Sequence, residues 1–236
     1  MNGRRTPMNP CQKPTGWLGR LVLWNMNWRH SKVTDWGLSH ISIEEHDTIL
    51  DVGCGGGRTV SKLAAFAPKG KVCGIDFSKD SVAMASRINR KLIDAGRVQI
   101  REASVSQLPF PDDMFDLVTA VETHFWWPNL PTDILETLRV LKPGGTLIII
   151  AEIYKGADTP TAKLAEKHLP LGGMALLSVN EHRELLANAG CSNIQVIEEK
   201  GKGWICAIGR KPIAKGSSSA AMVTSPTVDI GTSRVP

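Results

Sequence analysis

A glycine-rich loop is the first stretch of the sequence whose residue types could do chemistry. It runs ILDVGCGGGRT over residues 49–59, and its apolar start predicts a buried strand that ends at Asp51. The glycines that follow, Gly53 and Gly55 on either side of Cys54 among them, remove the side chains that would keep a ligand away from the backbone amides. The loop therefore predicts a ligand site at the carboxyl end of a central strand.

A second acid follows the loop at an informative distance. The next predicted strand, KVCGID, ends in Asp76, about 20 residues after the loop, where a carboxylate can accept hydrogen bonds from both hydroxyls of a ribose. The strict nicotinamide fingerprint fails, because Arg58 stands where G-x-G-x-x-G, counted from Gly53, needs its third glycine. Phe77 either packs on an adenine face or is a core residue at the sheet edge. These residues indicate a ribose-containing ligand.

The segment VETHFWWPN, residues 121–129, carries candidate groups for acid–base chemistry. It follows a predicted strand, and ligands of open α/β sheets bind beyond the carboxyl ends of strands. If the segment is extended, Glu122, His124 and Trp126 share one face. His124 is then a general base or an acceptor-orienting group, or else a structural histidine, and Glu122 is either its partner or a contact to the ligand itself. Of Trp126 and Trp127, one is expected to line the pocket and the other to pack.

The N-terminal segment offers further candidates. Trp17, Leu21, Trp24 and Trp28 recur at helical spacing, which predicts an amphipathic helix. His30 follows it as a second candidate base. Trp28 is a candidate contact for an apolar or aromatic acceptor, although the stripe could also simply cover the sheet.

The elements that must position these residues alternate along the chain. Seven short apolar runs predict strands at 48–53, 71–76, 97–102, 115–121, 145–152, 193–199 and 203–210. Helical periodicity falls between them, at about 57–67, 79–95, 129–141 and 180–189. This alternation predicts an α/β fold with a parallel sheet and helices on both faces, closed by an antiparallel hairpin.

The chain divides into three parts. Residues 1–46 are expected to form an N-terminal arm and lid helices, and residues 47–211 the folded domain. Within it, residues 155–178 interrupt the alternation with Pro and Gly and are expected to form a lid. Residues 212–236 are rich in Ser, Thr, Pro and Gly and are expected to be disordered.

Composition narrows the class of protein. The 236 residues are 42% hydrophobic and 22% charged, as in ordinary globular proteins. The net charge is +5, and the basic residues are spread along the chain and mixed with acidic ones. We therefore expect no nucleic-acid partner. Five cysteines without a CxxC pair predict neither a disulfide framework nor a metal site, and favour a reducing compartment. Since no run approaches the roughly 18 apolar residues of a spanning helix, we expect a cytoplasmic protein without stable membrane association.

Four segments together carry a family resemblance. LDVGCGGG, VCGIDFS, SQLPFPDDMFDLVTA and RVLKPGG, in this order over residues 48–151, resemble the class I S-adenosylmethionine-dependent methyltransferases of the small-molecule type. The resemblance implies a Rossmann-like, doubly wound sheet of seven strands in the order 3-2-1-4-5-7-6. That sheet is mostly parallel with an antiparallel last strand. The implied cofactor is S-adenosylmethionine.

The resemblance also implies residue roles. Asp51 would orient the loop and approach the methionine amino group, while Gly53 and Gly55 face the cofactor. Asp76 would hold the ribose hydroxyls, and Phe77 would flank the adenine.

One position departs from the family pattern. Where the family often has an acid before LPF that binds the adenine amino group, this chain has Ser104 followed by Val105. The serine hydroxyl or the Val105 backbone amide could serve instead. Val121, at the end of the fourth predicted strand, and Cys54 complete the predicted cofactor-binding set.

The implied reaction is methyl transfer to an oxygen, nitrogen or sulfur nucleophile of a small molecule by in-line displacement. A catalytic base is needed for a hydroxyl or protonated amine and less for a thiol. A quinone-type carbon methyltransferase, a nucleic-acid methyltransferase and a non-catalytic cofactor-binding protein remain alternatives. A nicotinamide oxidoreductase is disfavoured by the missing third glycine. The protein is expected to be a monomer or homodimer.

Overall fold

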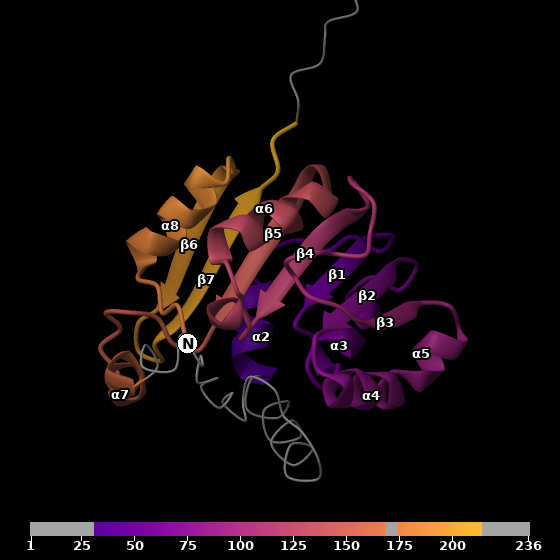
Figure 1. Ribbon diagram of the computed structural model, residues 1–236, viewed down its shortest axis with the longest axis horizontal. Coiled ribbons are helices and arrows are strands. Elements are labelled where there is room, and N and C mark those ends of the chain that lie inside the picture. Colours follow the sequence, from indigo (N-terminus) through magenta and orange to yellow (C-terminus); the bar gives the residue numbers. More distant parts are fainter. Residues whose placement is uncertain (1–30, 169–173, 214–236) are drawn as a thin grey trace, which may run out of the picture.

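The computed structural model describes residues 31–168 and 174–213 (Figure 1). Its strands are β1 (Thr48–Val52), β2 (Lys71–Asp76), β3 (Val98–Glu102), β4 (Phe115–Val121), β5 (Leu141–Ala151), β6 (Ser192–Glu199) and β7 (Trp204–Arg210). Its helices are α2 (Ser31–Leu38), α3 (Arg58–Phe66), α4 (Lys79–Ile88), α5 (Arg90–Asp94), the 3₁₀ helix η1 (His124–Trp126), α6 (Leu130–Val140), α7 (Pro160–His168) and α8 (Val179–Asn188).

The strands form one seven-stranded sheet. Their order is β3-β2-β1-β4-β5-β7-β6, and β7 runs antiparallel to both β5 and β6 while the other neighbours are parallel. This is the predicted topology, including the closing hairpin. The carboxyl ends of β1, β2 and β4 therefore meet at one edge of the sheet, where the predicted site residues stand.

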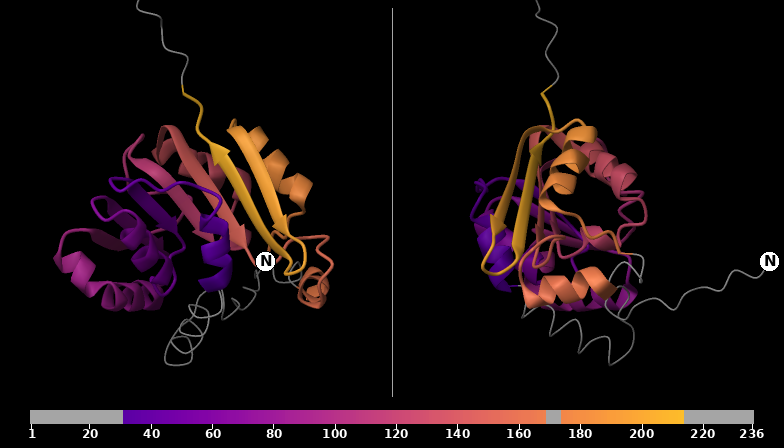
Figure 2. Two further views of the ribbon diagram at one scale, coloured as in Figure 1. Left: turned by 180° about the vertical axis from the view of Figure 1, so that it is seen from behind. Right: turned by 90° about the vertical axis from the view of Figure 1, so that its left-hand side faces the viewer.

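Helices cover both faces of the sheet, as the turned view makes plain (Figure 2). One core cluster joins the sheet to α6 and α8, and includes Leu147 and Ile149 of β5. A second joins the opposite face to α2, α3 and α4, and includes Ile148 and Ile150 of the same strand. Because central parallel strands are buried on both faces, their sequences are continuous apolar runs rather than alternating ones.

The predicted helix over 79–95 is interrupted. Asn89 separates α4 from α5, and its buried side-chain amide donates hydrogen bonds of 2.9 Å to the carbonyls of Ala85 and Gly57. Its side-chain oxygen accepts a 2.6 Å hydrogen bond from Ser61 of α3. The break in the helix thus anchors the end of the glycine loop to α4.

Some predictions fall partly or wholly outside the described residues. The predicted N-terminal helix with Trp28 and His30 lies there, as do residues 169–173 of the predicted lid and residues 214–236 of the predicted tail. The described part of the lid segment contains α7. None of the described helices is long and apolar enough to cross a membrane.

Candidate functional site

The glycine loop has one open position between two packed ones. Gly53, Gly55 and Gly57 all have left-handed backbone, with φ of 74°, 51° and 81°. A Cβ on Gly53 would lie 2.1 Å from the Thr123 hydroxyl, and one on Gly57 would lie 2.7 Å from Ala85. A Cβ on Gly55 would meet nothing within 4 Å. The outer glycines therefore permit close packing, whereas Gly55 leaves its backbone accessible to a ligand.

Cys54 points away from this open space. Its side chain is buried in the second core cluster, and its backbone N–H donates to the Ile75 carbonyl at 2.8 Å. Burial raises the pKa of the thiol well above its usual value. Within the predicted cofactor-binding set, Cys54 thus serves the shape of the loop through its backbone, and its thiol stays protonated.

Asp51 is a buried acid with one unsatisfied oxygen. Its side chain is 1% exposed, and Oδ1 accepts a 2.7 Å hydrogen bond from Thr119. Oδ2 has no hydrogen-bond partner among the described residues. Burial raises the pKa of Asp51 to about 7; the Thr119 hydrogen bond opposes this shift and the charge of Asp76 adds to it. A cationic ligand group beside Oδ2 would therefore be bound favourably.

Asp76 is held by backbone amides at the end of β2. Its Oδ2 accepts from the Gly55 N–H at 2.9 Å, and its Oδ1 accepts from the Ser78 N–H at 2.8 Å. Burial raises its pKa, against the effect of these two hydrogen bonds. The Ser81 side chain also hydrogen-bonds to this carboxylate. Since an ionised carboxylate has about four acceptor positions, the group as a whole retains capacity for a ligand hydroxyl. Phe77 follows with 40% of its surface exposed, so part of its side chain is accessible to a ligand.

The remaining predicted cofactor contacts are less distinctive. Ser104 is exposed, and its hydroxyl accepts a local hydrogen bond of 3.2 Å from the Ser106 N–H. Val105 is buried in the first core cluster. Val121 ends β4 and packs, partly buried, against the second cluster. Their contacts with a cofactor stay predictions.

The segment after β4 is not extended, so the predicted common face of Glu122, His124 and Trp126 is wrong. Residues 124–126 form η1, in which the Trp126 N–H donates to the Thr123 carbonyl at 2.9 Å. Glu122 has left-handed backbone with φ of 57°, and its carboxylate accepts from the Glu152 N–H. The predicted Glu122–His124 pair is also wrong, because this reversal of the backbone directs the two side chains to different partners.

The partner of His124 is a histidine that the sequence analysis missed. The two Nε2 atoms of His124 and His182 lie 3.2 Å apart, and each side chain is 1% exposed. Burial, followed by the neighbouring His182, lowers the pKa of His124 well below its usual value. His182 precedes the fully buried Leu186 of α8 by four residues, so its place on the inward helix face was a usable signal.

Of the two tryptophans after His124, Trp127 packs in the core. Trp127 is 8% exposed, lies in the first core cluster, and places its indole nitrogen 3.4 Å from the Thr123 hydroxyl. Trp126 is partly buried against a third cluster that contains Phe125 and Tyr154. Whether Trp126 also contacts an acceptor stays a prediction.

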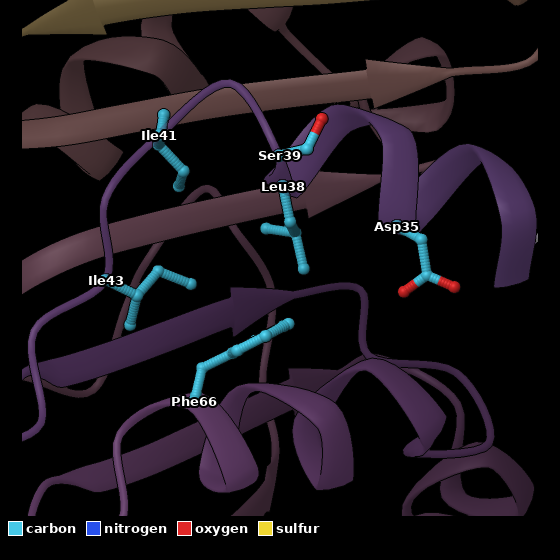
Figure 3. Close-up of a pocket in the computed structure, with 6 residues that line it drawn as sticks. All are labelled: Asp35, Leu38, Ser39, Ile41, Ile43 and Phe66. Carbon is cyan, nitrogen blue, oxygen red and sulfur yellow. The ribbon is translucent and has the colours of Figure 1, made fainter.

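A separate surface hollow lies away from this edge (Figure 3). It has a volume of about 400 Å³ and is lined by Asp35, Leu38, Ser39, Ile41, Ile43 and Phe66. Phe66, one of its lining residues, lies at the opposite end of α3 from the glycine loop. Residues 31–168 and 174–213 contain no group of three or more His, Cys, Asp or Glu that could hold a metal ion.

Comparison with known families identifies the domain. The family model described as a methyltransferase domain matches residues 50–149, which include the glycine loop, Asp76 and His124. This stretch is a class I methyltransferase domain. The match runs from β1 to β5 and so spans the edge at which the site residues gather.

Relatives of the methyltransferase domain include curated proteins of two kinds. The chain is 31% identical over 159 residues to "O-methyltransferase cnsE" of Penicillium expansum. The matched region covers 67% of this chain and 56% of that protein. The chain is 32% identical over 126 residues to a demethylmenaquinone methyltransferase of Bacillus licheniformis, covering 52% of each. The chain thus spans just over half the length of these relatives.

A solved structure confirms the fold of the domain. The crystal structure of an S-adenosylmethionine-dependent methyltransferase from Aquifex aeolicus superposes with a TM-score of 0.66 at 21% identity. The match covers 80% of this chain and 97% of that one.

Proposed function

We propose that this protein is an S-adenosylmethionine-dependent methyltransferase that acts on an oxygen, nitrogen or sulfur nucleophile of a small molecule. One arrangement carries the proposal. Asp76, an acid with spare acceptor capacity, accepts a hydrogen bond from the open backbone of Gly55, and its charge acts on Asp51, a buried acid with an unsatisfied oxygen.

The chemical groups that line this edge match those of the cofactor. Asp76 would accept from the ribose hydroxyls, Asp51 Oδ2 would meet the ammonium of the methionine part, and Phe77 would cover the adenine. Gly53 and Gly55 would allow close approach to the loop backbone. When bound, S-adenosylmethionine supplies a methyl group on a sulfonium, which is reactive without help from the protein.

His124 is the base in this proposal. Its low pKa keeps it neutral near pH 7, so a nitrogen lone pair is available to take a proton from a hydroxyl or an ammonium. Its neighbour Thr123 touches the glycine loop at Gly53, which places His124 one residue from the loop. The protein's other task is alignment, since in-line displacement needs the acceptor held opposite the leaving sulfur.

The acceptor is proposed to be small, apolar or aromatic. Trp126 follows His124 by two residues in η1 and is only partly buried, and an indole suits contact with an aromatic acceptor. The names of the relatives support oxygen acceptors in one case and a quinone-type acceptor in the other. Carbon methylation of a quinone-type ring is therefore the second candidate. A nucleic-acid acceptor is not favoured, because the basic residues are mixed with acids along the chain.

A panel assay tests the proposal. Purified full-length chain is incubated with methyl-labelled S-adenosylmethionine and one of catechol, β-mercaptoethanol, aniline or menadiol, and S-adenosylhomocysteine and labelled product are measured. We expect at least one acceptor to give more labelled product than the same mixture without protein. The position of the methyl group in that product distinguishes transfer to oxygen from transfer to carbon. Failure of the protein to bind S-adenosylhomocysteine in calorimetry would overturn the proposal, whatever the panel gives.

A further inference from the structure

Two buried histidines from distant parts of the chain meet beside the end of β4. His124 belongs to η1 and His182 to α8, and 58 residues separate them in sequence. Their ring centroids are 5.2 Å apart and their Nε2 atoms 3.2 Å apart. Hydrogen-bond distance between two nitrogens requires one of them to carry the proton. The proposed function uses His124 alone and leaves His182 without a role.

The surroundings of His182 decide which nitrogen donates. His182 Nδ1 lies 2.8 Å from the Ser178 carbonyl, which can only accept, so Nδ1 carries a proton. Burial lowers the pKa of His182, against the effect of that carbonyl, and the ring is neutral. Its Nε2 is then a bare acceptor. The shared hydrogen bond therefore runs from the Nε2–H of His124 to the Nε2 of His182.

The start of α8 fixes the Ser178 carbonyl. The Ser178 hydroxyl accepts from the Glu181 N–H at 3.2 Å, and the Glu181 carboxylate accepts from the Ser178 N–H at 2.7 Å. This reciprocal capping box holds the first turn of the helix in place. The orientation of the His182 ring is thus set by the local structure of its own helix.

The Nδ1 atom of His124 is left bare by this assignment. It is buried and has no hydrogen-bond partner among the described residues. An unsatisfied buried acceptor costs stability, and native proteins retain few of them without a functional reason. Thr123, the residue before His124, packs against the glycine loop at Gly53, so His124 is one residue from the proposed cofactor edge.

We propose that His182 is a positioning residue that holds His124 in its Nε2–H tautomer and presents the Nδ1 lone pair of His124 to the acceptor. The inference rests on the proposed function. In the step concerned, a lone pair of the acceptor forms the bond to the methyl carbon, the carbon–sulfur bond breaks, and its electron pair goes to sulfur. The acceptor's proton passes to Nδ1 of His124. The resulting imidazolium keeps its Nε2–H bond to His182, so no ring has to rotate.

A neutral histidine suits this place better than a carboxylate. A carboxylate so deeply buried would pay a desolvation penalty and would tend to take up the proton itself. A neutral Nε2 accepts the hydrogen bond without that cost, while its lone pair still stabilises the positive ring. The pair thus orients His124 as a carboxylate orients the histidine of a hydrolase triad, without a fixed charge.

Nuclear magnetic resonance tests the proton assignment directly. The full chain is labelled with ¹⁵N-histidine, with S-adenosylhomocysteine present, and the two rings are assigned from spectra of His124→Gln and His182→Gln. We expect His124 as the Nε2–H tautomer and His182 as the Nδ1–H tautomer. A His124 ring protonated on Nδ1 and bare on Nε2 would overturn the proposal.

Variants of His182 test the role itself. His182→Leu removes the acceptor and should leave His124 as a mixture of tautomers, with kcat about tenfold lower on the panel acceptor that gives product and unchanged affinity for S-adenosylhomocysteine. His182→Gln keeps an acceptor near the same place and should restore most of kcat. Leu185→Ala, a partly buried change on the same helix, should leave the His124 tautomer unaltered.

The outcomes separate this inference from the function on which it rests. An unchanged His124 tautomer in His182→Leu would overturn the positioning role even if the protein is a methyltransferase. If wild type does not bind S-adenosylhomocysteine, the proposed function fails and the role in catalysis falls with it. The tautomer assignment, which needs no acceptor, is measured in either case.

Discussion

The loop after β1 and the segment after β4 lie at the ends of paired strands, yet they reach their geometry by different means. In the loop, left-handed glycines set the backbone, and the acid at the end of β2 is held by N–H groups of the loop and of Ser78. After β4, Glu122 reverses the chain and His124 is held by a side chain from α8. We call the glycine loop with Asp51 and Asp76 the cofactor half of the site, and the segment after β4 with His124 the acceptor half. The geometry of the cofactor half is thus encoded locally, whereas that of the acceptor half depends on packing between distant segments.

The largest expected effect tests the cofactor half. Asp76→Ala should weaken S-adenosylhomocysteine binding about 1,000-fold in calorimetry, because two ribose hydroxyls lose a charged acceptor and each such hydrogen bond is worth about 2 kcal/mol. Glu102→Ala is the matched control, since Glu102 is exposed and lies beside Asp76 in the β2–β3 register. Equal affinities for the two variants would remove the ribose role of Asp76.

The acceptor half is tested by His124→Gln. We expect kcat to fall about 100-fold while affinity for S-adenosylhomocysteine changes less than about twofold, as for loss of a general base. His46→Gln serves as the control, because His46 has an exposed side chain. If His124→Gln lowers the affinity for S-adenosylhomocysteine as much as it lowers kcat, His124 also contributes to cofactor binding, and the two halves of the site are not independent.

Asp51 gives a pH dependence to the cofactor half. With its pKa raised to about 7, Asp51 is mostly protonated below that pH, and binding an ammonium beside Oδ2 requires its ionised form. Affinity for S-adenosylhomocysteine should therefore rise about tenfold from pH 5 to pH 6 and level off above pH 7. Calorimetry on Asp51→Asn should show no such rise; a persisting rise would assign it to another group.

The same shift predicts the stability of the free protein. A folded pKa above the ordinary value of 3.8 means that ionisation of Asp51 disfavours the folded state. Stability from this group is fully present below about pH 4 and is lost as the pH rises through about 7. The free energy of unfolding of Asp51→Asn, compared with wild type over this range, should lack that decline.

The smallest expected effect compares two left-handed glycines. Gly55 and Gly96 have φ of 51° and 70°, and a Cβ on either would meet nothing within 4 Å. Replacement of each by Ala should lower the free energy of unfolding by about 1 kcal/mol, for the strained backbone alone. In calorimetry, Gly55→Ala should also weaken S-adenosylhomocysteine binding, whereas Gly96→Ala should not. Equal binding would mean that the open face at Gly55 is not the cofactor site.

The contrast between the two halves also explains what the sequence could predict. The strands and the glycine loop followed from continuous apolar runs, glycine spacing and the distance to Asp76, whereas the order of the strands in the sheet came from the family resemblance. The turn at 124–126 did not, because the assumed alternation ignored the Thr123–Trp126 hydrogen bond that closes η1. The partner of His124 lies 58 residues away, and only the packing of α8 against the sheet brings it there.

Thermal unfolding with two ligands tests the central claim most directly. S-adenosylhomocysteine and NAD share a ribose and an adenine, so the comparison asks which class of cofactor the edge around Gly55 accepts. We expect S-adenosylhomocysteine to raise the Tm of wild type in a concentration-dependent way, and NAD to leave it unchanged. Stabilisation by NAD with none by S-adenosylhomocysteine would contradict the account.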